Sequence, residues 1–262
     1  MKLKLKESIT VEKGAVYQPG NLLFSQAYSV YECRGFSNVE IGGTGWPSPN
    51  FVYHIAWDGR NLLVVFSSTR YVHKCHGLTN TITDSIYLSS PVCDLAWCGN
   101  NLCVAHRDIN EIRVYRGFSN TPIKQIYLPD ARSCACDPGR LYSAQCVDEY
   151  CENSRYNKHY GFTGTIADSF TIRCAGDITW DGENLIIVCG GAQEIRQQDG
   201  FSDRTKYVRG RVESVGGYIH GVAWKYFMGA PRARFISRLF PVQDGVRCSY
   251  PRSGYCVIIS LD

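Results

Sequence analysis

The sequence predicts an all-β chain folded as a six-bladed β-propeller, with four antiparallel strands per blade and the ring closed by terminal strands. Two repeated sequence markers and the composition lead to this prediction. Both markers recur at intervals of about 40 residues, the usual length of a four-stranded blade. The 262 residues include 17 Tyr and 25 Gly but only 2 Met, which is typical of strands joined by tight turns.

The first marker is an apolar run, a turn that contains glycine, and a second apolar run. Its clearest copy is Ile-Ala-Trp-Asp-Gly-Arg-Asn-Leu-Leu-Val-Val at 55–65, and related copies lie at 95–104 and 178–187. This pattern predicts a β-hairpin. Degenerate copies centre on Gly20 and Gly139, and a last copy has Tyr226 in the place of the glycine.

The second marker is Gly-Phe-Ser or a close variant of it. Glycine is expected there for a positive φ, Asp or Asn for hydrogen bonds within the turns, and the repeated Trp of the first marker for packing between blades. Two independent markers that keep one period indicate a true structural repeat. The copies of the second marker begin at Gly35, Gly77, Gly117, Gly161 and Gly200, with a degenerate sixth copy at Asp244-Gly-Val.

Each repeat unit has room for four short strands. In the third unit these are expected at 92–97, 102–106, 111–115 and 123–128. Residues 1–11 and 256–261 compete for the strand that closes the ring, and the sequence leaves this choice open. The predicted blades of the single domain 1–262 are 12–51, 52–90, 91–130, 131–174, 175–217 and 218–262, with 1–11 as a closing strand.

The repeated Trp-Asp-Gly-x-Asn-Leu and Gly-Phe-Ser-x-x-Ile segments resemble the Trp-Asp-Gly-type propeller repeats of uncharacterised microbial and viral proteins. More distantly, the chain is similar to six-bladed propellers of the NHL and TolB kinds. The resemblance covers nearly the whole chain and implies mainly a binding or scaffolding role, because propellers host many unrelated activities. The viral and surface members favour a structural or adhesive part.

Polar residues recur three positions before the repeated Trp, where the register predicts that they surround one mouth of the central channel. His, Asp and Cys side chains that converge there could bind a metal or a small polar ligand. The alternative is a water-filled channel with polar walls. Carboxylates are too few for a calcium site of the lactonase type, so neither a cofactor nor a resident metal is predicted. The candidate ligand-binding residues are His54, Asp94, Cys134, Asp177 and His220.

Known catalytic motifs are missing from the sequence. It has no Gly-x-Ser-x-Gly elbow, no glycine-rich phosphate loop and no His-Glu-x-x-His segment. The aspartate boxes of sialidase propellers are absent as well. No catalytic residue is therefore predicted, and the loops that vary from blade to blade are the expected contact surface.

The net charge of +4 is unevenly distributed, with ten bases against three acids between positions 203 and 252. These bases either serve solubility or form a basic surface for a glycan, another polyanion or an acidic partner, while nucleic acid is not expected. The predicted basic surface consists of Arg204, Arg209, Arg211, Arg232, Arg234 and Arg238.

The 13 cysteines are an odd number, so at least one is not in an intramolecular disulfide. The best disulfide candidates flank short polar loops: Cys146 with Cys151, and Cys248 with Cys256. Most other thiols are expected to be free. Cys103 and Cys189 lie in apolar runs, where a free cysteine behaves as a small hydrophobic residue.

No apolar run approaches the roughly 20 residues of a membrane span, and lysines alternate with apolar residues at the N-terminus, unlike a signal peptide. A cytoplasmic or virion-associated protein is expected. The leading hypothesis is a non-enzymatic structural or interaction propeller with protein partners, within a viral particle or another large assembly. The alternatives are a carbohydrate- or polyanion-binding adhesin and a metal-dependent hydrolase or lactonase with a site at the channel mouth.

Overall fold

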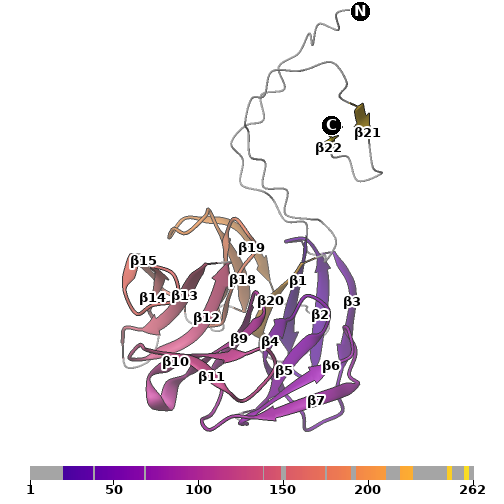
Figure 1. Cartoon of the computed structure of the whole chain (residues 1–262), viewed down its shortest axis with the longest axis horizontal. Coiled ribbons are helices and arrows are strands. Elements are labelled where there is room, and N and C mark those ends of the chain that lie inside the picture. The colour runs from indigo at the N-terminus through magenta and orange to yellow at the C-terminus, as the bar shows by residue number, and fades with distance from the viewer. Residues whose placement is uncertain are drawn as a thin grey trace, which may run out of the picture. The chain divides into compact units, whose positions relative to one another are not determined.

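The computed structural model describes residues 20–37, 39–67, 69–137, 139–148, 152–174, 176–189, 193–210, 219–226, 247–249 and 257–259. The chain divides into two compact units, Met1–Met228 and Gly229–Asp262. The first unit contains five four-stranded antiparallel sheets arranged as the blades of a β-propeller (Figure 1). The described residues of the second unit form one two-stranded antiparallel sheet, β21 (Arg247–Ser249) with β22 (Val257–Ile259).

Four blades are each built from consecutive strands, with the first strand innermost. Blade 2 consists of β4 (Val52–Trp57), β5 (Leu62–Phe66), β6 (Tyr71–Cys75) and β7 (Ile82–Tyr87). Blade 3 consists of β8 (Asp94–Cys98), β9 (Asn101–His106), β10 (Glu111–Arg116) and β11 (Pro122–Tyr127), with a short 3-10 helix η1 (Arg107–Ile109). Blade 4 consists of β12 (Ala131–Asp137), β13 (Arg140–Cys146), β14 (Ser154–His159) and β15 (Ile166–Ile172). Blade 5 consists of β16 (Ile178–Trp180), β17 (Leu185–Cys189), β18 (Glu194–Gln198) and β19 (Thr205–Gly210).

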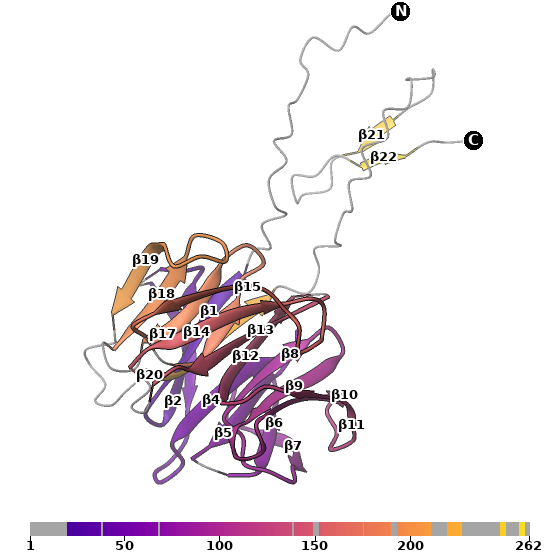
Figure 2. The same ribbon diagram turned by 90° about the vertical axis from the view of Figure 1, so that its left-hand side faces the viewer.

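Blade 1 is assembled from two distant parts of the chain. Its strands are β20 (Ile219–Tyr226), β1 (Gly20–Gln26), β2 (Ser29–Arg34) and β3 (Glu40–Gly45), in that order across the sheet. Strand β20, the last strand of the first unit, pairs antiparallel with β1, and Gly20 lies opposite Tyr226 in the register. The ring is closed by this pairing. Figure 2 shows the five blades turned by 90° from the view of Figure 1.

The predicted count of six blades is therefore wrong, and the propeller has five. The inner position beside β1, the first described strand of the first repeat unit, is occupied by β20 from the start of the sixth unit. The first and sixth repeat units thus contribute strands to one shared blade, which the repeat count treats as two blades. The predicted closing strand 1–11 lies outside the described residues, whereas part of the competing segment 256–261 is β22, which pairs with β21.

In four of the five blades a hydrogen bond joins the two sequence markers. In blade 2 the backbone N–H of Gly77 donates to the side-chain Oδ1 of Asn61 at 3.2 Å. Both ends of this contact are marker residues, which explains why the two markers keep one period. Blade 4 has Arg140 in the place of the asparagine. The same bond recurs as Gly35 to Asn21, Gly117 to Asn101 and Gly200 to Asn184, at 3.2, 3.3 and 3.1 Å.

The repeated tryptophans pack between blades, as the sequence predicts. Trp57 of blade 2 shares a buried cluster with Leu23 and Ala223 of blade 1. The ring of Trp180 in blade 5 stacks on Tyr142 of blade 4, with 4.6 Å between ring centroids. Burial of large apolar side chains between neighbouring sheets is the main favourable term that holds the blades together.

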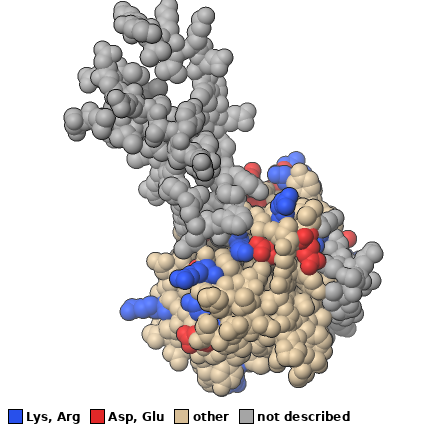
Figure 3. Space-filling view, turned by 90° about the vertical axis from the view of Figure 1, so that its right-hand side faces the viewer, with Lys and Arg blue, Asp and Glu red and all other residues tan. Residues whose placement is uncertain are grey.

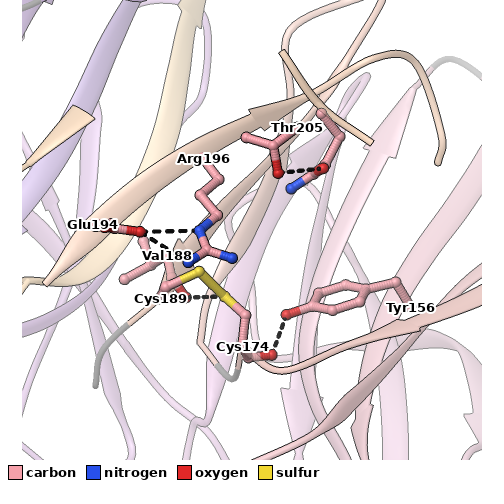
Figure 4. The surroundings of a disulfide bond; sticks show 8 residues. Tyr156, Cys174, Val188, Cys189, Glu194, Arg196 and Thr205 are labelled. Atoms are coloured by element: carbon pink, nitrogen blue, oxygen red, sulfur yellow. Dashed lines mark hydrogen bonds and ion pairs between the residues drawn. A yellow bond between two sulfur atoms is a disulfide. The ribbon is translucent and has the colours of Figure 1, made fainter. Parts of the chain in front are cut away.

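Two disulfides of the propeller differ from the predicted pairs. Cys98 is bonded to Cys136, and Cys174 is bonded to Cys189 (Figure 4), so the expectation that Cys189 is free is wrong. The expectation for Cys103 is met, since it is a buried free thiol.

Both predicted disulfide pairs include residues that the structure does not describe. Cys146 is disulfide-bonded, but Cys151 lies outside the described residues. The same holds for Cys256 and for the side chain of Cys248. In the part of the chain that the structure describes, no helix has the length and apolar character of a membrane span.

Candidate functional site

Three polar side chains from three blades converge where the inner strands begin. His54 is the third residue of β4, Asp94 is the first residue of β8, and Asp177 directly precedes β16. Their nearest potential ligand atoms all lie within 4.8 Å of one another. The Nδ1 atom of His54 is 2.7 Å from Oδ2 of Asp177 and 4.0 Å from Oδ1 of Asp94. We refer to these three residues as the channel triad.

Hydrogen bonds from neighbouring strands fix the carboxylate of Asp94. Its Oδ2 accepts the hydroxyl proton of Ser133 and the backbone N–H of Cys134, the latter at 2.9 Å. Its Oδ1 accepts the N–H of Leu95 at 2.7 Å. The Oγ of Ser133 in turn accepts the N–H of Ile178 at 2.8 Å, so this serine connects the inner strands of blades 3, 4 and 5.

The channel triad is shielded from solvent and carries little compensating positive charge. The side chains of His54, Asp94 and Asp177 are 15%, 1% and 8% exposed. Burial, and then the nearby charge of Asp177, raises the pKa of Asp94 well above its usual range, and burial likewise raises the pKa of Asp177. Burial lowers the pKa of His54. Among the described residues, neither carboxylate has an ion pair with a lysine or an arginine.

The remaining predicted residues lie nearby without joining the triad. The thiol of Cys134 donates to the backbone carbonyl of Cys103 at 3.7 Å, and Cys134 contributes only its N–H to the site. The ring of His220 stacks on Tyr53, with 4.6 Å between ring centroids. Blade 1 has Gly221 at the position that corresponds to the triad residues.

Steric space explains the glycine in blade 1. A Cβ atom on Gly221 would lie 2.8 Å from the carbonyl oxygen of Tyr53 and 3.0 Å from the Cα of His54. Strands β20 and β4 therefore approach too closely for a side chain at this position, and only four of the five blades can place one there.

Below the triad the channel is narrow. A cavity of about 30 Å³ lies between the inner strands and is lined by Trp57, Trp97, Trp180 and Trp224 among others. Such a volume holds roughly two water molecules and excludes an organic ligand. The tryptophans that join the blades thus also restrict the channel.

Only two of the six arginines of the predicted basic surface are among the described residues. Arg204 is exposed and pairs with Asp199 at 2.6 Å. Arg209 is 4% exposed, and its guanidinium carbon lies 4.4 Å from the centroid of the Phe24 ring, so it lies in the interior rather than on a basic surface. Figure 3 shows acidic groups among the basic ones on the face that it displays. Arg211, Arg232, Arg234 and Arg238 lie outside the described residues.

The structure places Ser133, and not the predicted Cys134, at the blade-4 position that corresponds to the triad residues. Ser133 lies opposite Ala144 as Asp94 lies opposite Ala105, and Cys136 lies opposite Leu141 as Trp97 lies opposite Leu102. The hairpin glycine of blade 4 is Gly139, one residue later than in blades 2, 3 and 5, so an alignment on the leucine that follows the turn would have found Ser133. The contact between Ser133 and Asp94 spans 39 residues and depends on the way neighbouring blades pack.

Comparisons with known proteins bear on the fold. No protein-family model matches the chain, and no curated protein matches it. A chain of the nidogen/laminin complex is similar with a TM-score of 0.53 and 10% identity, over 79% of this chain and 99% of that one. A Myxococcus xanthus glutaminyl cyclase gives a TM-score of 0.47 and 13% identity, over 69% and 81%. The Pan2 WD40 domain of Neurospora crassa gives 0.40 and 10%, over 76% and 64%. The first likeness supports an all-β propeller with four antiparallel strands per blade.

Proposed function

We propose that this chain is a non-enzymatic interaction module that joins a larger protein assembly, such as a viral particle, through the outer edge of blades 2 and 3. The observation that carries this proposal is a set of exposed tyrosines on these two blades. We refer to Tyr71, Tyr87 and Tyr127 as the tyrosine edge.

The tyrosine edge presents large aromatic surfaces to solvent. Tyr71, Tyr87 and Tyr127 are 47%, 49% and 69% exposed. Tyr87 and Tyr127 are the last residues of β7 and β11, and each is followed by a buried leucine, Leu88 or Leu128. The leucines anchor the ends of the two strands in the core. The propeller repeat thus places two tyrosines at corresponding positions of neighbouring blades.

Tyr87 and Tyr127 lie on β7 and β11, the outermost strands of their sheets, which are each paired on one side only, and Tyr71 lies on the neighbouring strand β6. Tyr87 lies opposite Tyr71 in the register, with ring centroids 5.1 Å apart. Exposed Ile82 and Ile123 add apolar surface to the same two strands. Aromatic side chains are enriched at protein interfaces and often dominate their energy, and an open strand edge is itself a docking feature.

The two alternative functions have less support. A polyanion- or glycan-binding role depends on the six arginines of the predicted basic surface. Arg209 is buried, Arg204 is paired with Asp199, and the other four lie outside the described residues. A hydrolase needs a substrate cavity, and the cavity between the inner strands has room for water only.

Size exclusion with light scattering, over a wide concentration range and with and without reductant, tests the proposal. A second copy of the chain is the simplest partner, so a defined multimer is expected. Its mass should fall to that of one chain in the Tyr87→Ser/Tyr127→Ser variant. The matched control is Tyr160→Ser, which removes a tyrosine of intermediate exposure, 62% against 49% and 69% for Tyr87 and Tyr127, from a turn of blade 4. A single-chain mass at every concentration, or a multimer that the double variant leaves intact, would contradict the proposal.

A further inference from the structure

We propose that the channel triad of His54, Asp94 and Asp177 binds one divalent transition-metal cation of the Zn²⁺ or Mn²⁺ class at the mouth of the propeller channel. This site is independent of the tyrosine edge and of the interaction role. It also revises the expectation, drawn from the sequence, that the protein holds no metal.

The first argument is the geometry of the donor atoms. Metal–nitrogen and metal–oxygen bonds of about 2.0–2.2 Å place ligand atoms roughly 3–4 Å from one another around the metal. The Nδ1 atom of His54 lies 2.7 Å from one aspartate oxygen and 4.0 Å from another, and the set spans at most 4.8 Å. Small side-chain movements are enough to place all three atoms around one ion.

The second argument is charge. Two carboxylates lie close together with exposed fractions of 1% and 8%, and the imidazole of His54 is the only basic side chain that pairs with them among the described residues. Buried like charges repel, so such a pair persists either by holding a proton or by holding a cation. A divalent cation would neutralise both carboxylates and leave His54 as a neutral ligand.

The third argument is the support around the ligands. Ser133 and the N–H of Cys134 hold one oxygen of Asp94, and Ser133 is itself held by the N–H of Ile178, the residue after Asp177. Hydrogen bonds of this kind orient metal ligands in advance and raise affinity. Two of the three triad positions are thus tied together before any ion binds.

The class of cation follows from the donor set. One imidazole nitrogen and two carboxylate oxygens suit Zn²⁺ or Mn²⁺, whereas Ca²⁺ takes six to eight oxygen ligands. The Cys134 thiol is directed to the carbonyl of Cys103, so no thiolate joins the set. Three protein ligands leave at least one coordination position for water.

A titration of the full chain with Mn²⁺ tests the site. The protein is first treated with EDTA and dialysed, and free Mn²⁺ is followed by electron paramagnetic resonance. Mn²⁺ is the chosen probe because it prefers oxygen and nitrogen donors to the free thiols of this chain. One ion per chain is expected, with affinity reduced at least tenfold by His54→Ala and by Asp177→Asn. The matched control His73→Ala removes a histidine of β6 that contacts Ser85 and should leave the affinity unchanged.

Melting temperatures with and without Mn²⁺ distinguish two explanations of the channel triad, a bound cation and a proton shared by the two carboxylates. Metal-free Asp177→Asn should be at least as stable as the original chain, because the substitution removes one of two neighbouring buried carboxylates. Mn²⁺ at a hundredfold excess over its dissociation constant should raise the melting temperature of the original chain by several degrees and leave this variant unchanged. No bound Mn²⁺ at about 1 mM, or equal binding by the variants, would overturn the proposal and leave a protonated carboxyl pair as the explanation of the triad.

Discussion

The disulfide between Cys98 and Cys136 joins the inner strand of blade 3 to the inner strand of blade 4. Cys98 stands where the intact hairpin marker has its aspartate, as at Asp58 and Asp181. In blade 4, Cys136 itself stands where the other blades have their tryptophan, because it lies opposite Leu141 as Trp97 lies opposite Leu102. The covalent bond therefore lies at the junction where blade 4 lacks the tryptophan that elsewhere packs against the preceding blade.

We expect the Cys98→Ser/Cys136→Ser variant to be destabilised by roughly 3–4 kcal/mol, because the bond closes a loop with a sequence separation of 38. The measurement is urea unfolding with and without reductant. Reductant should still lower the midpoint of this variant, through Cys174–Cys189 and the disulfide of Cys146, and by less than in the original chain. Equal midpoints of the original chain in both conditions would show that the bond contributes nothing.

His159 makes the stability depend on pH in acid. It is 1% exposed, its Nε2 lies 2.8 Å from the Ser143 hydroxyl, and burial lowers its pKa from 6.5 to about 4. The unfolded chain therefore binds a proton at a higher pH than the folded chain. Stability from this group is complete above pH 6.5 and is lost as the pH falls toward about 4.

The loss amounts to at most about 3 kcal/mol from the size of the shift. His159→Gln keeps an acceptor for Ser143 and cannot be charged, so its free energy of unfolding should fall less between neutral pH and pH 4. The comparison uses denaturant unfolding at a series of pH values. Parallel curves for the two proteins would refute the role assigned to His159.

The hydrogen bond between the two sequence markers should contribute to stability. Asn61→Ala removes the acceptor of the Gly77 N–H and the donor to Asp58. We expect a loss of about 1–2 kcal/mol in urea unfolding. The control Asn120→Ala changes an exposed asparagine in a turn of blade 3 and should alter stability by less than about 0.5 kcal/mol. Similar losses for both variants would argue against a specific role of this bond.

The close approach of β20 and β4 should make Gly221 intolerant of substitution. Gly221→Ala places a Cβ within 3.0 Å of the backbone of Tyr53 and His54, and we expect a loss of roughly 1–3 kcal/mol. Gly42→Ala in the outer strand β3 is the control, because its Cβ would have its nearest neighbour at 3.8 Å. Thermal unfolding measures both variants, and unchanged stability of Gly221→Ala would show that the strands can separate at no cost.

The sequence by itself determined the propeller repeat, the four strands of each blade and the interblade role of the tryptophans. These features depend on contacts within one unit of about 40 residues, or on the same contact repeated between units, so they leave a periodic signal. The positions of His54, Asp94 and Asp177 could likewise be read from their spacing to the repeated Trp.

The tertiary structure alone decided features that depend on residues far apart in the chain. The blade count fell to five because β20 pairs with β1, and a repeat count cannot tell a shared blade from two separate ones. The bond from Cys98 to Cys136 and the hydrogen bond from Ser133 to Asp94 each join neighbouring blades. In both cases blade 4 departs from the repeated residue type, with cysteine in the place of tryptophan and serine in the place of the His or Asp of the triad. A periodic pattern carries no information where its period fails, and there the packing of the blades determines which side chains meet.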